Sequence, residues 1–79
     1  MAKFPVDAPK SQVIRVLEHF RFSLVRAKEH ISMTRQNSDG TTTPLTLPNH
    51  KLIKGSTLKS ICTQSGISRD DFITAYEQI

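Results

Sequence analysis

Apolar residues recur with the period of a helix near the start of the chain. Four of them occupy positions i, i+3, i+4 and i+7: Val13, Val16, Leu17 and Phe20. This spacing predicts a helix with one buried face. Asp7 is a candidate N-cap and Pro9 is tolerated in a first turn, so we expect the helix to begin close to residue 7. Residues 1–6 lack this pattern and are predicted to form a loose end.

After Phe22 the hydrophobic period changes from helical to two residues, which is typical of strands. Phe22 and Leu24 share one face of the first predicted strand, and Ile31 and Met33 share one face of the second. The pleat of the second strand then turns His30 toward the opposite, more exposed face. We therefore expect two neighbouring strands, each with one face toward the core.

The turn-forming cluster Asn-Ser-Asp-Gly at 37–40 predicts a hairpin after the second strand. A third strand follows, in which Leu45 and Leu47 point to the same face. Pro44 has no backbone N–H to donate to a neighbouring strand, which places this strand at an edge of the sheet. Pro48 is expected to end it.

Residues 49–55 are polar and basic and are predicted to form a loop. Ser56 or Thr57 can cap a second helix after this loop, and Gly66 is expected to end that helix. Its inward residues are Leu58, Ile61 and Cys62.

Ser68, followed three residues later by Asp71, resembles a capping box at the start of a third helix. Its apolar residues again follow a helical period: Phe72, Ala75, Tyr76 and Ile79. The predicted order of elements is α-β-β-β-α-α. Because short links join the three strands, we expect one α+β domain over residues 1–79, with a three-stranded antiparallel sheet and its helices on one face.

The positive charge is concentrated in the middle of the chain. The net charge is +4, and residues 21–59 hold seven Lys or Arg against two Asp or Glu, which favours a polyanionic partner. Cys62 is the single cysteine, and no apolar run is long enough to span a membrane, so we expect a cytoplasmic protein. His and Cys show no zinc-site spacing, and we expect no metal or other cofactor.

An exposed histidine among cations can exchange a proton while the cations hold a phosphodiester. His30 is the candidate catalytic residue, and Arg26 and Lys28 stand near it in the sequence. Activation of a ribose 2′-OH requires RNA as the substrate. The simpler alternative is that His30 is a surface strand residue without a chemical role. His19 and Cys62 are interpreted as structural residues.

A second candidate site lies where the predicted loop enters the second helix. Lys51, Lys54, Ser56 and Thr57 are grouped near a helix N-terminus, where free amides favour an anion such as phosphate. An ordinary helix entrance explains the same residues. His50 is a weaker candidate for a second proton-transfer group.

Several segments together resemble the HicA family. They are residues 30–33 (His-Ile-Ser-Met), the turn at 37–40, residues 43–50 (Thr-Pro-Leu-Thr-Leu-Pro-Asn-His), residues 54–58 (Lys-Gly-Ser-Thr-Leu) and residues 64–68 (Gln-Ser-Gly-Ile-Ser). The last two segments in combination carry most of the specificity. The resemblance implies a fold like that of double-stranded-RNA-binding domains. It also implies a toxin that cleaves mRNA as an endoribonuclease and a HicB-type antitoxin as its partner.

The resemblance implies roles for individual residues as well. The catalytic histidine of the family matches His30, and the family's structural Gly-Thr or Gly-Ser-Thr helix start matches residues 55–57. Lys28 and Glu29 stand where the family usually has Gly and then Ser or Asn. This departure keeps a second hypothesis open, a non-catalytic RNA-binding or regulatory module in which Glu29 repels phosphate. A DNA-binding helix-turn-helix over residues 56–79 is a third, disfavoured by its acidic second helix.

Overall fold

The computed structural model describes residues 5–79, so residues 1–4 of the predicted loose end lie outside the described residues. Its elements along the chain are β1 (Asp7–Pro9), α1 (Lys10–His19), β2 (Ser23–Ala27), β3 (His30–Gln36), β4 (Thr42–Pro48), β5 (Leu52–Lys54), α2 (Gly55–Ser65) and α3 (Arg69–Gln78). They form an α+β fold, which confirms the predicted class.

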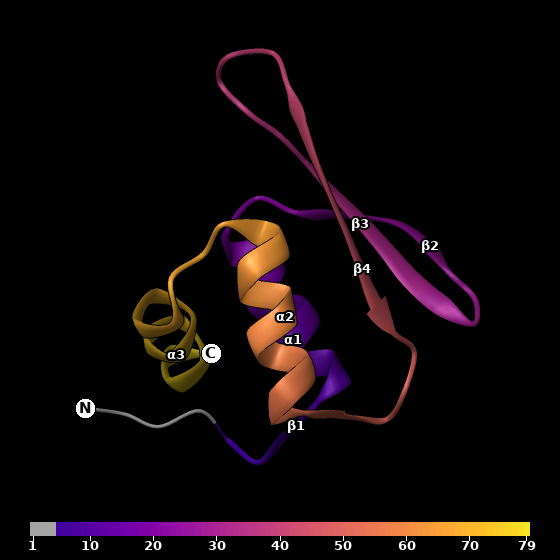
Figure 1. Ribbon diagram of the computed structural model, residues 1–79, viewed down its shortest axis with the longest axis vertical. Helices are drawn as coiled ribbons and strands as arrows, with labels where there is room; N and C mark the ends of the chain where they lie inside the picture. The colour runs from indigo at the N-terminus through magenta and orange to yellow at the C-terminus, as the bar shows by residue number, and fades with distance from the viewer. Residues whose placement is uncertain (1–4) are drawn as a thin grey trace.

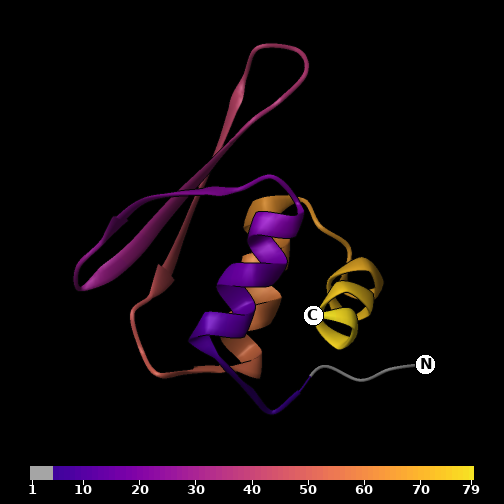
Figure 2. The ribbon, with the colours of Figure 1, turned by 180° about the vertical axis from the view of Figure 1, so that it is seen from behind.

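Strands β2, β3 and β4 form an antiparallel sheet with β3 in the centre. Helices α1 and α2 lie on one face of this sheet, and α3 packs on the side of the helices that is remote from the sheet (Figures 1 and 2). The order α1-β2-β3-β4-α2-α3 agrees with the prediction. Pro44 lies in β4, at an edge of the sheet, as its missing N–H requires.

Two short strands that the sequence did not reveal form a second sheet. β1 pairs antiparallel with β5, and the buried residues Ala8 and Ile53 lie opposite each other. The prediction that Asp7 caps α1 is wrong, because Asp7 lies in β1 and Pro9 precedes the helix without a side-chain cap. The prediction of a loop over residues 49–55 is wrong for the part that forms β5.

The start of α2 also differs from the prediction. The helix begins at Gly55 with Lys54 as its N-cap, and neither Ser56 nor Thr57 caps it. The Gly55 N–H donates to the carbonyl of Val6 at an N···O distance of 2.7 Å. A Cβ on residue 55 would lie only 2.8 Å from the carbonyl oxygen of Pro5, the residue before Val6. Glycine is needed here because the backbone before β1 approaches the helix so closely.

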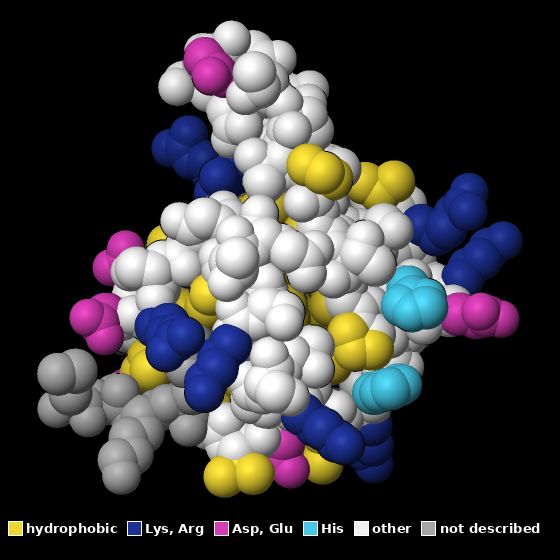
Figure 3. Space-filling model, viewed as in Figure 1, with side chains coloured by type: hydrophobic (Ala, Val, Ile, Leu, Met, Phe, Trp, Pro, Cys, Tyr) yellow, Lys and Arg dark blue, Asp and Glu magenta, His cyan; other side chains and the backbone are white. Residues whose placement is uncertain are grey.

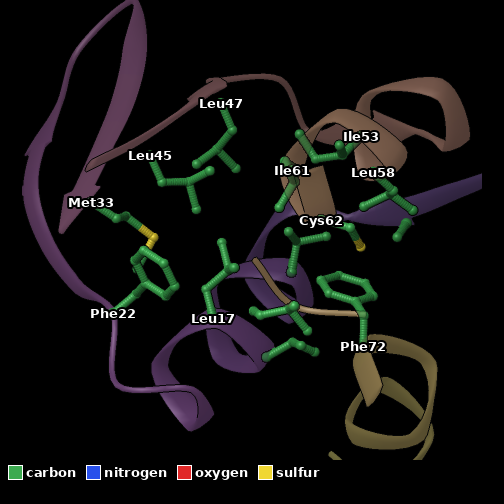
Figure 4. Close-up of a cluster of buried hydrophobic side chains, with 14 of the residues drawn as sticks. Leu17, Phe22, Met33, Leu45, Leu47, Ile53, Leu58, Ile61, Cys62 and Phe72 are labelled. Carbon is green, nitrogen blue, oxygen red and sulfur yellow. The ribbon is translucent and has the colours of Figure 1, made fainter. Parts of the chain in front are cut away.

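The core lies between the sheet and the helices (Figure 4). Leu24 departs from the predicted pattern, because it is half exposed on an edge strand, whereas Phe22 just before β2 is buried. The residues predicted to face inward are otherwise buried, apart from Phe20, Tyr76 and Ile79 near the helix ends. The buried set includes Val13, Val16, Leu17, Ile31, Met33, Leu45, Leu47, Leu58, Ile61, Cys62, Phe72 and Ala75.

The predicted C-terminal end of α2 and the predicted start of α3 are confirmed. Gly66 follows α2 with a left-handed φ of 75°, which residues other than glycine adopt at a cost. The Ser68 hydroxyl accepts a hydrogen bond from the Asp71 N–H at 3.1 Å and so caps α3. Arg21 has a φ of 73° after α1, in the conformation that glycine has after α2.

Candidate nucleic-acid interface

His30 is the first residue of β3 and lies opposite Pro48, the last residue of β4. Ile31 and Met33 are buried beneath the helices, so the pleat directs the His30 imidazole to the opposite face of the sheet. The side chain of His30 is exposed there. A ligand can therefore reach this imidazole from solvent.

A β-bulge in β2 decides which side chains share this face with His30. Leu24 pairs with a core residue of β3, but the next pair along the two strands is Arg26 with Ser32. Val25 is therefore an extra residue in β2. Directly opposed residues lie on the same face of a sheet, which places Arg26 and Ser32 on the face of His30.

The bulge reverses what an uninterrupted period of two gives for β2. Counted from Phe22 without a bulge, Arg26 and Lys28 fall on the side of the sheet that faces the core. In the structure Arg26 lies opposite an outward residue, and the Lys28 N–H donates to the His30 carbonyl at 3.2 Å. Arg26 thus belongs to the exposed face because of the bulge, and Lys28 is an exposed residue of the turn that precedes His30. Glu29 is exposed in the turn between them and β3.

The loop after β4 brings further cations to this end of the sheet. The Asn49 backbone N–H donates to the Glu29 carbonyl at 3.3 Å, and its Nδ2 donates to the Lys28 carbonyl at 2.6 Å. The Lys10 Nζ donates to Asn49 Oδ1 at 2.6 Å, and the Lys10 backbone N–H donates to the Lys51 carbonyl at 3.0 Å. These bonds join the loop and the start of α1 to the turn that precedes β3.

Histidine and basic side chains gather on the side of the molecule that carries the β2–β3 turn and the loop after β4 (Figure 3). His50 is exposed in that loop, next to Asn49. Positive charge around an exposed imidazole is the arrangement that a phosphodiester requires, because each phosphate carries a negative charge.

Lys54, Ser56 and Thr57 belong to a different part of the surface. Lys54 lies opposite Asp7 in the second sheet, and α2 begins directly after it. One of the free amides expected at this helix start, that of Gly55, is already bonded to a backbone carbonyl. The structure therefore places these residues at the entrance of α2. Arg26 and Lys28 lie near His30 at the end of the larger sheet, and Lys51 lies in the loop between β4 and β5.

Arg35 is a basic residue of the middle segment that stabilises the fold. Its guanidinium lies 4.9 Å from the centroid of the Phe22 ring, a cation–π contact. It also donates to Asn37 Oδ1 at 3.1 Å and to the Ser65 carbonyl at 3.2 Å. These contacts connect the hairpin to the end of α2.

The positions of Cys62 and His19 fit their structural interpretation. Cys62 is buried in α2, and burial raises the pKa of its thiol, with Arg69 acting in the opposite direction. A thiol that keeps its proton is a poor nucleophile. The His19 ring meets Phe20 edge-on, with ring centroids 5.2 Å apart, at a shallow hollow beside α3.

Within residues 5–79, no three His, Cys, Asp or Glu side chains are grouped so that they could bind a metal ion. In the same part of the chain no helix is both long and apolar enough to cross a membrane.

Lys10 and Asn49 are the residues of this surface that sequence reasoning missed. Their side chains meet across 39 positions of sequence, and no local spacing signals such a contact. The only available hint was that Asn49 falls within the segment 43–50 that resembles the HicA family.

Fold and site together define a small α+β domain with a histidine on a basic, exposed sheet face. A family model described as HicA toxin of bacterial toxin-antitoxin matches residues 11–67, which is more than half of the chain. The protein therefore belongs to the HicA family, the toxins of bacterial toxin–antitoxin systems, and membership implies an antitoxin partner. No curated protein and no solved structure gives a significant match.

Proposed function

We propose that this protein is an endoribonuclease that cleaves mRNA, with His30 as its general acid or base. The observation that carries the proposal is the exposed imidazole at the start of β3, with Arg26 on the same face and Lys28 in the turn directly before it. Membership of the HicA family supports it. A HicB-type antitoxin is the proposed protein partner, and the cytoplasm is the proposed location.

In the proposed reaction the His30 imidazole accepts the proton of a ribose 2′-OH while that oxygen attacks the adjacent phosphorus. The bond between phosphorus and the 5′ oxygen breaks, and His50 is a candidate to protonate the leaving oxygen. The products end in a 2′,3′-cyclic phosphate and a 5′-hydroxyl, so the reaction balances without a metal or cofactor. Arg26, Lys28 and Lys51 offset the charge that develops on the phosphoryl oxygens.

Lys54, Ser56 and Thr57 remain proposed contacts to a further phosphate of the same RNA. Their place at the start of α2 supports this role, because the dipole and the remaining amides of a helix N-terminus favour an anion.

The test compares His30→Ala with His19→Ala as the matched control. Both residues are exposed histidines, but His19 ends α1 and lies beside α3, which packs on the side of the helices remote from the sheet (Figure 1). We expect His30→Ala to lose at least about 10²-fold in the rate of RNA cleavage, the usual contribution of general acid–base catalysis, and His19→Ala to cleave at the wild-type rate. Cleavage by His30→Ala at the wild-type rate would remove His30 from the mechanism.

A non-catalytic RNA-binding module is the second candidate function. It is favoured by Glu29, whose carboxylate is exposed beside His30. In that case the purified protein binds RNA with a steep dependence on salt concentration and leaves it uncut. Incubation of the wild-type protein with end-labelled mRNA, followed by analysis of fragment length, distinguishes the two functions.

A further inference from the structure

Asn49 connects two parts of the chain that carry basic residues of the candidate site. Its Nδ2 donates to the Lys28 carbonyl at 2.6 Å, and its backbone N–H donates to the Glu29 carbonyl at 3.3 Å. Its Oδ1 accepts from the Lys10 Nζ at 2.6 Å. One residue thus binds both carbonyls of the turn that precedes His30 and one cation from α1.

The bonding partners determine the orientation of the Asn49 amide. A lysine ammonium only donates and a peptide carbonyl only accepts, so Oδ1 must face Lys10 and Nδ2 must face the Lys28 carbonyl. An aspartate in this position keeps the acceptor and loses the donor. An alanine loses both. Aspartate therefore removes only the bond to the Lys28 carbonyl, whereas alanine also removes the bond from Lys10.

We propose that Asn49 is a positioning residue for the His30 imidazole and that Lys10 is a further phosphate contact of the same site. This inference rests on the proposed function. The two carbonyls held by Asn49 belong to the residues directly before His30, so a shift of this turn moves the imidazole. The Lys10 backbone N–H also holds the Lys51 carbonyl, which ties a second cation to the same unit.

The Lys10 ammonium can serve two partners at once. It carries three N–H donors, of which one reaches Asn49, and it is half-buried at the start of α1. Its position is therefore fixed by Asn49 while the remaining donors stay available for a phosphate oxygen.

The experiment measures kcat and KM for RNA cleavage in Asn49→Ala, Asn49→Asp and Lys10→Met. Asn37→Ala is the matched control, because Asn37 also holds a turn, through bonds from Nδ2 to Thr41 and Thr43 at the other end of the β3–β4 hairpin. We expect both Asn49 variants to lower kcat by about 10- to 10²-fold, the effect of a displaced catalytic group. Lys10→Met should raise KM with little change in kcat, and Asn37→Ala should change neither.

Two outcomes separate this inference from the proposed function. If His30→Ala is inactive but both Asn49 variants keep kcat within about two-fold of wild type, Asn49 does not position His30 and the nuclease assignment stands. If the wild-type protein cuts no RNA, the proposed function fails, and the ring resonances of His30 in NMR spectra decide the inference. They must shift in Asn49→Ala and not in Asn37→Ala, and unchanged resonances in Asn49→Ala refute it.

Discussion

Replacement of Arg21 by glycine should stabilise this protein, although glycine usually weakens a fold. Arg21 is the only non-glycine residue within residues 5–79 with a positive φ, at 73°. It closes α1 in a Schellman motif, in which its N–H donates to the Glu18 carbonyl at 2.9 Å and the Phe22 N–H donates to the Leu17 carbonyl at 3.0 Å. Glycine can form both bonds without the steric cost of a Cβ in the left-handed region.

The size of the effect follows from two opposing contributions. The left-handed conformation costs an L-residue about 1–2 kcal/mol, and the greater freedom of glycine in the unfolded chain costs about 0.5–1 kcal/mol. The net gain for Arg21→Gly is therefore about 0.5–1 kcal/mol. In a domain of this size 1 kcal/mol corresponds to about 4–8 °C in Tm, so we expect a rise of about 2–8 °C.

Gly66 provides the reverse experiment at the end of α2. Its φ of 75° nearly equals that of Arg21, and a Cβ built on it meets no heavy atom within 4 Å. The same two contributions apply in reverse, so Gly66→Ala should lose about 0.5–1 kcal/mol. Arg21→Ala serves as the control for the lost charge, since it keeps the Cβ and should leave stability nearly unchanged.

Urea unfolding followed by circular dichroism measures all three free energies of unfolding on the same scale. The reasoning is refuted if Arg21→Gly unfolds at lower urea concentration than wild type, or if Arg21→Ala is stabilised as much as Arg21→Gly. The second result would assign the gain to the removal of a positive charge rather than to backbone conformation.

Two further predictions concern β2 and α2. Val25 is the extra residue of the bulge and is 63% exposed. Its deletion should therefore leave Arg26 opposite Ser32 and preserve the affinity for RNA. A large loss of RNA affinity with an intact fold would show that the bulge does not set this register. Burial raises the pKa of the Cys62 thiol, so the folded state retains its proton at a pH where the unfolded state loses it. This contribution to stability is complete below the unfolded-state pKa and is lost as the pH rises through the folded-state pKa, so Cys62→Ser should unfold with a weaker dependence on alkaline pH. An equal loss of stability in both proteins would contradict it.

The features that could be predicted from the sequence are those that the residues of a single element decide. The helical period of Val13, Val16 and Leu17 specified the buried face of α1, and the alternation of Ile31 with Met33 specified the buried face of β3. Gly66 and Ser68 marked the ends of α2 and α3 because the conformations required there restrict the residue type. Family membership was likewise visible in short segments of sequence.

The outward direction of His30 belongs to this same group, since it follows from the pattern of β3 alone. The residues that share this face with His30 do not follow from that pattern. Arg26 shares its face only because Val25 is bulged, and a bulge is decided by how β2 fits against β3 rather than by the residues of β2. Strict alternation along β2, counted from Phe22, instead places Arg26 on the side of the sheet that faces the core.

The sequence by itself determined the helices, the three long strands, the core and the exposed place of the candidate histidine, because each depends on interactions between near neighbours in the chain. Only the tertiary structure decided the β1–β5 sheet, whose three-residue strands are too short to show a period and form only when paired. It also decided the contact of Lys10 with Asn49, which joins the start of α1 to the loop after β4. Contacts of this kind arise from the packing of distant segments, so no local pattern of residues encodes them.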